Sequence, residues 1–153
     1  MMKYLLPLLL ICGPVMAQSV GECGQLTAAA YLAEPWEENS AAFANGQVRA
    51  ALIDTIEPAA AAVHLLVLSP PRNEVGDRQC RLVSLSRSEG GGPVGFFSVD
   101  FAAHKAEYDP ARGLVLTMPV ASYDPETGGG DPAEMTLTIN QSTGEITAEV
   151  SGS

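Results

Sequence analysis

The sequence predicts an all-β fold: an antiparallel meander of about seven strands, arranged as a two-layer sandwich or a partly closed barrel, with a short N-terminal helix. Three observations support this fold class. Short runs of residues alternate between apolar and polar with a period of two, as half-buried strands do. Pro, Gly, Asn and Asp separate these runs. No long helical pattern lies between them, which excludes a βαβ arrangement.

The first 17 residues have the pattern of a secretory signal peptide. Lys3 precedes an apolar run over residues 5–11, and Val15 and Ala17 occupy the −3 and −1 positions of a cleavage site. We therefore expect cleavage after Ala17, a single β-rich domain over residues 18–153, and a periplasmic or secreted location.

Two alternatives to cleavage are a membrane anchor and a lipid attached at Cys12. An anchor needs about 20 apolar residues, whereas the apolar run here is broken at Gly13 and Pro14. A lipid-attachment motif has a small residue before the cysteine, and Ile11 stands there instead. We expect no integral membrane segment once the signal is removed.

Removal of the signal leaves two cysteines, Cys23 and Cys80, which in an exported protein are expected to form a disulfide bond. The bond would join the N-terminal segment to the middle of the sheet. The alternative is a redox-active thiol, because Arg78 and Arg81 flank Cys80 and would favour its thiolate form. The chain has no C-x-x-C pair to support that alternative.

The chain is strongly acidic. Eighteen Asp and Glu residues oppose eight Lys and Arg residues, for a formal charge of −10, and loss of Lys3 with the signal brings the charge to −11. Such a surface repels nucleic acid and anionic membranes, since both attract cations. We expect neither as a partner. The scarcity of lysine, with heavy use of Ala and Gly, suggests a bacterial protein from a GC-rich genome.

The first half of the chain contains one predicted helix and three predicted strands. Apolar residues at helical spacing predict the helix over about residues 24–33, and Pro35 ends it. The strands are expected over residues 47–56, 62–69 and 78–86, and the second is apolar on both faces, as a strand covered on both sides is. The first strand is expected to bury Val48, Ala50, Leu52 and Ile56. The turns between the second and third strands are placed at Pro70-Pro71 and Gly76-Asp77.

The second half begins with a flexible loop over residues 88–95, followed by four further strand patterns. The first is expected to bury Phe97, Val99 and Phe101, with a bulge or turn near residues 102–104. The others are expected to bury Leu114, Leu116, Met118 and Val120, then Met135, Leu137 and Ile139, then Ile146, Ala148 and Val150. Pro119 indicates an edge or a bulge, because proline donates no ladder hydrogen bond.

Three five-residue segments, DPARG (109–113), DPETG (124–128) and NQSTG (140–144), share one pattern. Each begins with Asp or Asn, whose side chain accepts hydrogen bonds within a turn, and ends with Gly, which tolerates the left-handed conformation. The acidic, glycine-rich loop over residues 123–132 contains the second copy. It is therefore predicted to be a hairpin connection.

The same loop raises the alternative of a calcium site. Its oxygen ligands would be Asp124, Glu126, Asp131 and Glu134. A calcium loop needs about six to eight oxygens at fixed positions, and here Gly128 and Met135 stand at the fifth and twelfth positions. We expect no metal and no cofactor.

No local pattern indicates catalysis. His64 and His104 have no ligand or catalytic partner at a suitable spacing, and His64 shares a face with apolar residues, which predicts a packed histidine with one hydrogen bond. The chain has no G-x-S-x-G motif and no cysteine outside the expected disulfide. We expect no catalytic residue and a protein that is not an enzyme.

Two features favour binding. Trp36, the single tryptophan, stands among Glu34, Glu37 and Glu38, as aromatic anchors of interfaces often do. The alternative is a tryptophan that closes one end of the sheet. The second feature is a group of arginines within 16 residues, which form either a patch for an anionic group or cross-strand pairs with acidic residues. Its members are Arg72, Arg78, Arg81 and Arg87.

Taken together, these features predict an exported, non-catalytic binding or accessory protein whose partner is another protein. The make-up is similar to that of many bacterial periplasmic accessory proteins, including the small barrels that inhibit lysozymes, in class but not in motif. One alternative is a carrier whose strands enclose a cavity for a small apolar ligand, which requires an unfilled interior. Another is an acidic inhibitor of a basic secreted enzyme, whose binding would weaken as salt rises.

Overall fold

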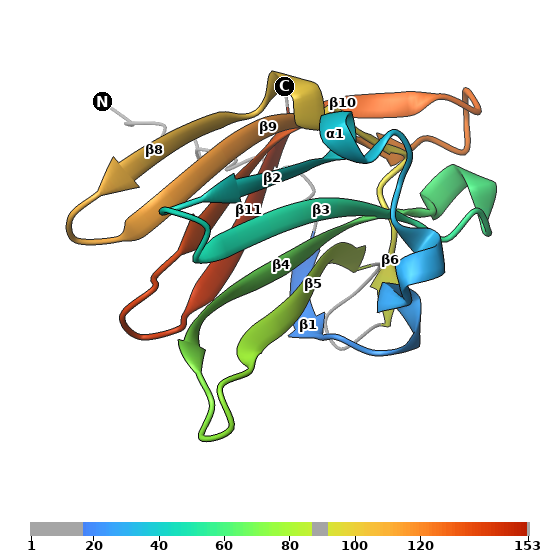
Figure 1. The fold of residues 1–153 in the computed structure, drawn as a ribbon. Coiled ribbons are helices and arrows are strands. Elements are labelled where there is room, and N and C mark those ends of the chain that lie inside the picture. The colour runs from blue at the N-terminus through green and yellow to red at the C-terminus, as the bar shows by residue number, and fades with distance from the viewer. Residues whose placement is uncertain (1–16, 87–91, 153) are drawn as a thin grey trace, which may run out of the picture.

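A computed structural model describes residues 17–86 and 92–152, and it confirms the all-β prediction (Figure 1). The described strands are β1 (Ala17–Glu22), β2 (Ser40–Phe43), β3 (Val48–Asp54), β4 (Val63–Arg72), β5 (Arg78–Ser86), β6 (Pro93–Val94), β7 (Ser98–Val99), β8 (Lys105–Asp109), β9 (Gly113–Tyr123), β10 (Gly130–Ile139) and β11 (Ile146–Gly152). The predicted signal peptide before Ala17, with Cys12, lies outside the described residues, as do Arg87 and residues 88–91 of the predicted flexible loop. The second half of that predicted loop is described and contains the short strand β6.

Two antiparallel sheets face each other. Sheet A has the strand order β1-β5-β4-β3-β2, with β6 paired to β5. Sheet B has the order β11-β10-β9, and β9 pairs on its other side with both β7 and β8. The sheets do not close into a barrel, so the sandwich is the correct one of the two predicted architectures (Figure 1).

The core lies between the sheets and is built from alternate residues of their strands. Its buried members are Val48, Ala50, Leu52, Leu65, Val67, Val83, Leu85, Phe96, Phe101, Leu114, Leu116, Met118, Val120, Met135, Leu137 and Ile139. The predicted inner faces of β9 and β10, and that of β3 as far as Leu52, are therefore confirmed. The inward residues of β11 are only partly buried, because β11 is the edge strand of sheet B.

Pro119 shows how one long strand serves two short partners. β8 pairs with β9 as far as Thr117, and β7 pairs with it from Val120 onward. Pro119 lies between these two stretches, where no ladder hydrogen bond from its nitrogen is needed. The gap is occupied by the 3-10 turn η4 (Phe101–Ala103), which confirms the turn predicted near residues 102–104.

The three Asx-to-Gly turns form as predicted. Asp109, Asp124 and Asn140 each accept a hydrogen bond through Oδ1 from the backbone N–H two residues later, at 2.8–3.1 Å. The closing glycines have φ values of +98°, +73° and +81°, a region that favours glycine. These hydrogen bonds lower the pKa of Asp124, through the Thr127 hydroxyl first and the Glu126 N–H second, and that of Asp109, through the Arg112 and Ala111 N–H groups.

The predicted N-terminal helix is placed differently. Residues 24–33 form two 3-10 turns, η1 (Gln25–Thr27) and η2 (Ala29–Tyr31), separated by Ala28 in an extended conformation. The α-helical turn is instead α1 (Trp36–Asn39), and it begins after Pro35. The alanine-rich run thus has helical spacing but no continuous helix. None of the helices in the described residues is long and apolar enough to cross a membrane.

Two residues predicted to be buried are exposed. Phe97 is exposed because the chain crosses between the sheets beside it: the N–H of Phe96 donates to Val63 O of sheet A at 2.7 Å, and that of Phe97 donates to Ala121 O of sheet B at 2.8 Å. Phe96 takes the buried position instead. Ile56 lies beyond the end of β3 at a φ of +68° and is 68% exposed.

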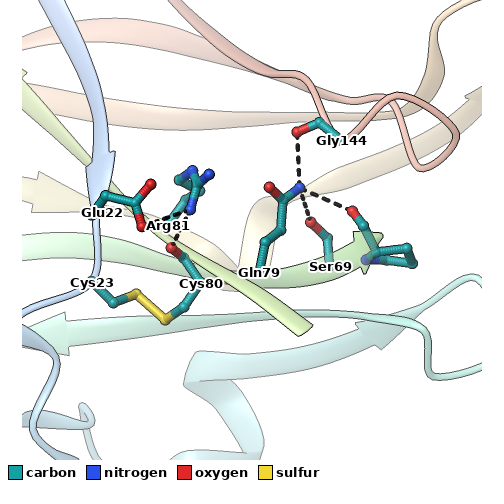
Figure 2. A network of polar contacts seen from close by, with 8 residues as sticks. Glu22, Cys23, Ser69, Gln79, Cys80, Arg81 and Gly144 are labelled. Atoms are coloured by element: carbon teal, nitrogen blue, oxygen red, sulfur yellow. Dashed lines mark hydrogen bonds and ion pairs between the residues drawn. A yellow bond between two sulfur atoms is a disulfide. The ribbon is translucent and has the colours of Figure 1, made fainter. Parts of the chain in front are cut away.

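The sheets are also joined by a polar contact at their edge. The Nε2 atom of Gln79 on β5 lies 2.8–2.9 Å from the Ser69 hydroxyl, the Pro70 carbonyl and the Gly144 carbonyl (Figure 2). Gly144 belongs to the turn between β10 and β11 of sheet B. Gln79 therefore fixes this turn against sheet A.

Candidate binding groove on the outer face of sheet A

Sheet A has an apolar outer face as well as an apolar inner one. The strand register places Ala51, Leu66 and Leu82 side by side across β3, β4 and β5, on the face opposite the core. The neighbouring row on one side is Ile53, His64 and Ser84. An apolar face of this kind needs a cover, since exposed apolar surface is unfavourable in water.

A segment near the N-terminus provides part of this cover. We call residues 23–32 the N-terminal strap. Cys23 forms a disulfide with Cys80 on β5, which confirms the predicted pairing (Figure 2). At the other end of the strap, Leu32 pairs with Ile53 along the edge of β3 that faces away from β4. The strap therefore passes over the outer face, across β4 and β3. Ile53, His64 and Leu82 are buried at this level.

Beside the strap the outer face remains open as a groove of about 430 Å³. Ala51, Leu66 and Leu68 contribute its floor, and Leu32 and Trp36 also line it. The floor leucines are half-buried although they belong to the central strand β4. The prediction that β4 is covered on both faces is thus confirmed at His64, which is buried, and is wrong at Leu66 and Leu68, which are half-buried.

Trp36 is held at the groove by its own short helix. It is the first residue of α1, its carbonyl accepts a hydrogen bond from the Ser40 hydroxyl at 2.7 Å, and the residue is 57% exposed. The Asn39 side chain bonds the Pro35 carbonyl at 3.1 Å in the same turn. The backbone of Trp36 is therefore fixed while half of its indole surface faces solvent, as in an aromatic anchor of an interface.

The surroundings of Trp36 are negatively charged. Glu34, Glu37 and Glu38 flank it along the chain, and all three are exposed. Arg49 is the one cation among the groove's lining residues. An apolar groove beside a tryptophan that exposed glutamates flank is complementary to a segment that carries an apolar side chain next to Lys or Arg.

The two histidines are packed. His64 is buried, its Nδ1 lies 2.7 Å from the Ser84 hydroxyl, and burial lowers its pKa, with Asp54 acting in the opposite direction. Because Ser84 is also fully buried, a substrate does not reach this pair. His104 packs against the rings of Phe101 and Phe43, and its Nδ1 lies 2.7 Å from the Phe101 carbonyl.

The acidic loop over residues 123–132 uses its first carboxylate for its own turn. Asp124 accepts the Glu126 N–H at 2.8 Å through Oδ1 and the Thr127 hydroxyl at 2.5 Å through Oδ2. Within the described residues, no three metal-binding side chains come together at a single place. Asp124, one of the four carboxylates considered as calcium ligands, thus caps its own turn.

The arginines behave in two ways. Arg81 forms a cross-strand ion pair with Glu22 at 3.0 Å, as the pairing alternative predicted (Figure 2). Arg72 and Arg78 form no ion pair with any described carboxylate.

The sequence does not predict the groove itself, although it does predict Trp36 as an interface residue. The signal in the sequence that points to the groove is the run over residues 63–68, which is apolar on both faces. Outside the predicted strands the chain has few residues that could cover the second face of this strand. Comparisons with protein-family models, with curated proteins and with solved structures find no match to this chain.

Proposed function

We propose that this is an exported, non-catalytic binding protein that attaches to another protein through the groove beside Trp36. The exposed indole at the edge of an unfilled apolar groove is the observation that carries the proposal. Exposed apolar grooves bounded by polar residues are typical of interaction sites. The disulfide and the signal-like N-terminus support export.

The chemistry of the groove favours a partner segment with an apolar side chain flanked by basic residues. The floor is formed by aliphatic side chains that gain from excluding water, and three exposed glutamates flank Trp36 along the chain. The charge of −11 expected for residues 18–153 would attract a basic partner from a distance.

A protein partner is favoured over a small ligand carried inside the fold. The carrier alternative depended on a closed barrel with an unfilled interior, whereas this chain forms two open sheets with large side chains packed between them. An acidic inhibitor of a basic secreted enzyme is the second candidate, favoured by the same glutamates and overall charge.

Site-specific photo-crosslinking tests the proposal. A photoreactive amino acid at position 36 is expected to give one discrete crosslinked product in cells that export the protein. The matched control is position 108, because Tyr108 is also a highly exposed aromatic residue, on β8 of the other sheet. The absence of a product from position 36, or equal products from both positions, would contradict the proposal.

Inhibition separates the two candidates once a partner is captured. Both candidates involve a basic partner, so in both the association rate should fall as ionic strength rises. If the partner is an enzyme that this protein inhibits, the enzyme's activity should also fall on binding, whereas an accessory role leaves the partner's activity intact. In both cases Trp36→Ala should weaken binding at least about tenfold, as loss of an interface hot spot does, and Tyr108→Ala should not.

A further inference from the structure

We propose that a second site, separate from the groove, binds a phosphate group between Arg72 and Arg78. The two residues end β4 and begin β5, and they are direct cross-strand neighbours across this hairpin. Together with Gln47 and Pro70 they line a pocket of about 460 Å³.

The pairing of two arginines needs an explanation, because like charges directly opposite each other destabilise a sheet. Acidic residues are more than twice as common as basic ones in this chain, so a partner of opposite charge is readily available. Arg81 has such a partner in its cross-strand neighbour Glu22. Arg78, at the beginning of the same strand, has a second arginine as its cross-strand neighbour on β4 instead.

The acidic residue next to Arg78 in the sequence is bonded elsewhere. Asp77 directly precedes Arg78, but its Oδ2 accepts a hydrogen bond from Asn73 Nδ2 at 3.2 Å. Asn73 in turn accepts the N–H groups of Val75 and Asp77 through Oδ1, at 3.1 and 2.8 Å. These bonds shape the hairpin loop without neutralising either arginine.

Backbone carbonyls hold both guanidinium groups. Arg72 Nη1 donates to Gly76 O at 2.6 Å, across the hairpin loop, and Arg78 Nη1 donates to Gly46 O at 3.4 Å, in the turn before β3. Each guanidinium has five N–H donors, and each spends one on these carbonyls. The remaining donors are available on two guanidinium groups that line one pocket.

A phosphate fits this arrangement better than a carboxylate. Arginine's planar fork matches the oxygens of either group, but one fork already satisfies a planar carboxylate. A phosphate offers oxygens in several directions and carries about 1.5 to 2 negative charges at neutral pH when esterified. It therefore satisfies two guanidinium groups at once. The acidic surface elsewhere repels a charged bilayer, which favours a small soluble phosphate over a lipid headgroup.

Thermal unfolding tests the site. Inorganic phosphate is expected to raise the melting temperature of the whole exported chain above that in chloride or acetate at the same ionic strength, because a ligand that binds the folded state stabilises it. Arg78→Gln should abolish this rise. In phosphate-free buffer the same variant should be as stable as the parent or slightly more stable, since it removes the repulsion between the two arginines.

The matched control is Arg112→Gln, which removes the same charge from an arginine already paired with Asp109 at 3.3 Å. It should keep the phosphate response, and Arg72→Lys, which retains the charge but loses the fork, should weaken phosphate binding about tenfold. Sedimentation with phosphatidylglycerol vesicles tests whether the phosphate belongs to a lipid headgroup. If the protein sediments with the vesicles and Arg78→Gln does not, the site is real and its ligand is a lipid headgroup. A phosphate response equal in Arg78→Gln and the parent, or a chloride effect of the same size, would overturn the proposal. None of these measurements involves Trp36, so failure here leaves the proposed partner groove unaffected.

Discussion

The Nδ1 atom of His64 on β4 lies 2.7 Å from the hydroxyl oxygen of Ser84 on β5, and both side chains are buried on the outer face of sheet A. This hydrogen bond satisfies two polar groups in a place where water does not reach them. It also places a titratable group at the level of the N-terminal strap.

The stability of the protein should therefore fall in mild acid. Burial lowers the pKa of His64 below its ordinary value of 6.5, so below that pH the unfolded chain binds more protons than the folded one, and the free energy of unfolding decreases as pH falls. The slope due to one histidine is at most about 1.4 kcal/mol per pH unit. Denaturant unfolding between pH 7.5 and pH 5.5 measures it. His64→Gln should flatten this region, and a curve in His64→Gln as steep as in the parent would contradict the assignment.

Loss of the Ser84 hydroxyl should destabilise the fold. In Ser84→Ala the His64 Nδ1 keeps its burial but loses its partner, which costs about 1–3 kcal/mol. Urea unfolding at pH 7.5 measures the change. Ser142→Ala is a suitable control, because Ser142 is exposed in a turn and its bond to Asn140 Oδ1 uses its backbone N–H; it should change stability by less than about 0.5 kcal/mol.

Removal of the disulfide should cost more than any single contact. Cys23 and Cys80 are 57 residues apart, and closing a loop of this length stabilises the fold by about 4 kcal/mol in the chain-entropy model. The double variant Cys23→Ser with Cys80→Ser should show this loss in denaturant unfolding. Reduction of the parent with dithiothreitol should give the same midpoint, and a midpoint unchanged by either treatment would show that the bond does not constrain the unfolded chain.

The three consecutive glycines of the acidic loop should respond differently to alanine. Gly128 has a φ of +73°, so Gly128→Ala should cost about 1 kcal/mol. Gly130→Ala should also destabilise, because its Cβ would lie 2.6 Å from the ring of Phe97, which stacks on Tyr123. Gly129 has neither restriction, and Gly129→Ala should be neutral within about 0.5 kcal/mol. Thermal unfolding ranks the three variants, and equal losses at all three positions would contradict this account.

Removal of divalent cations should leave stability unchanged. Asp124 already directs both carboxylate oxygens to its own turn, so we expect this turn to keep its structure without calcium. Melting curves with excess EDTA and with excess calcium should superimpose. A rise in the melting temperature with calcium that Asp131→Asn removes would show a metal site in this loop.

The parts of the fold that could be predicted are the strands in which the alternating pattern of apolar residues continues without interruption. From Leu114 to Val120, and again from Met135 to Ile139, every second residue is apolar, and every one of these positions is in the core. The disulfide could be predicted because two cysteines allow one pairing. The turns could be predicted because Asx and Gly have specific backbone chemistry.

The rest depended on contacts far apart in the sequence. Phe96 rather than Phe97 lies in the core because the chain crosses between the sheets at this point. The N–H of Phe96 bonds Val63 on sheet A, and that of Phe97 bonds Ala121 on sheet B. The alanine run over residues 24–33 does not continue as one helix because a disulfide and a strand bridge hold its ends at two strands of sheet A. The open groove results from the incomplete cover that this strap provides, which no local pattern of residues reports.

The strap also relates the cover on the outer face of sheet A to the chemical state of one bond. Its two attachments are unequal: Leu32 is held by backbone pairing, while Cys23 is held by a sulfur–sulfur bond that a reductant can open. Leu32, the strap residue that lines the groove, therefore keeps its attachment in either state. Reduction frees the Cys23 end alone, so both ends of the strap are fixed to sheet A only while the bond is oxidised.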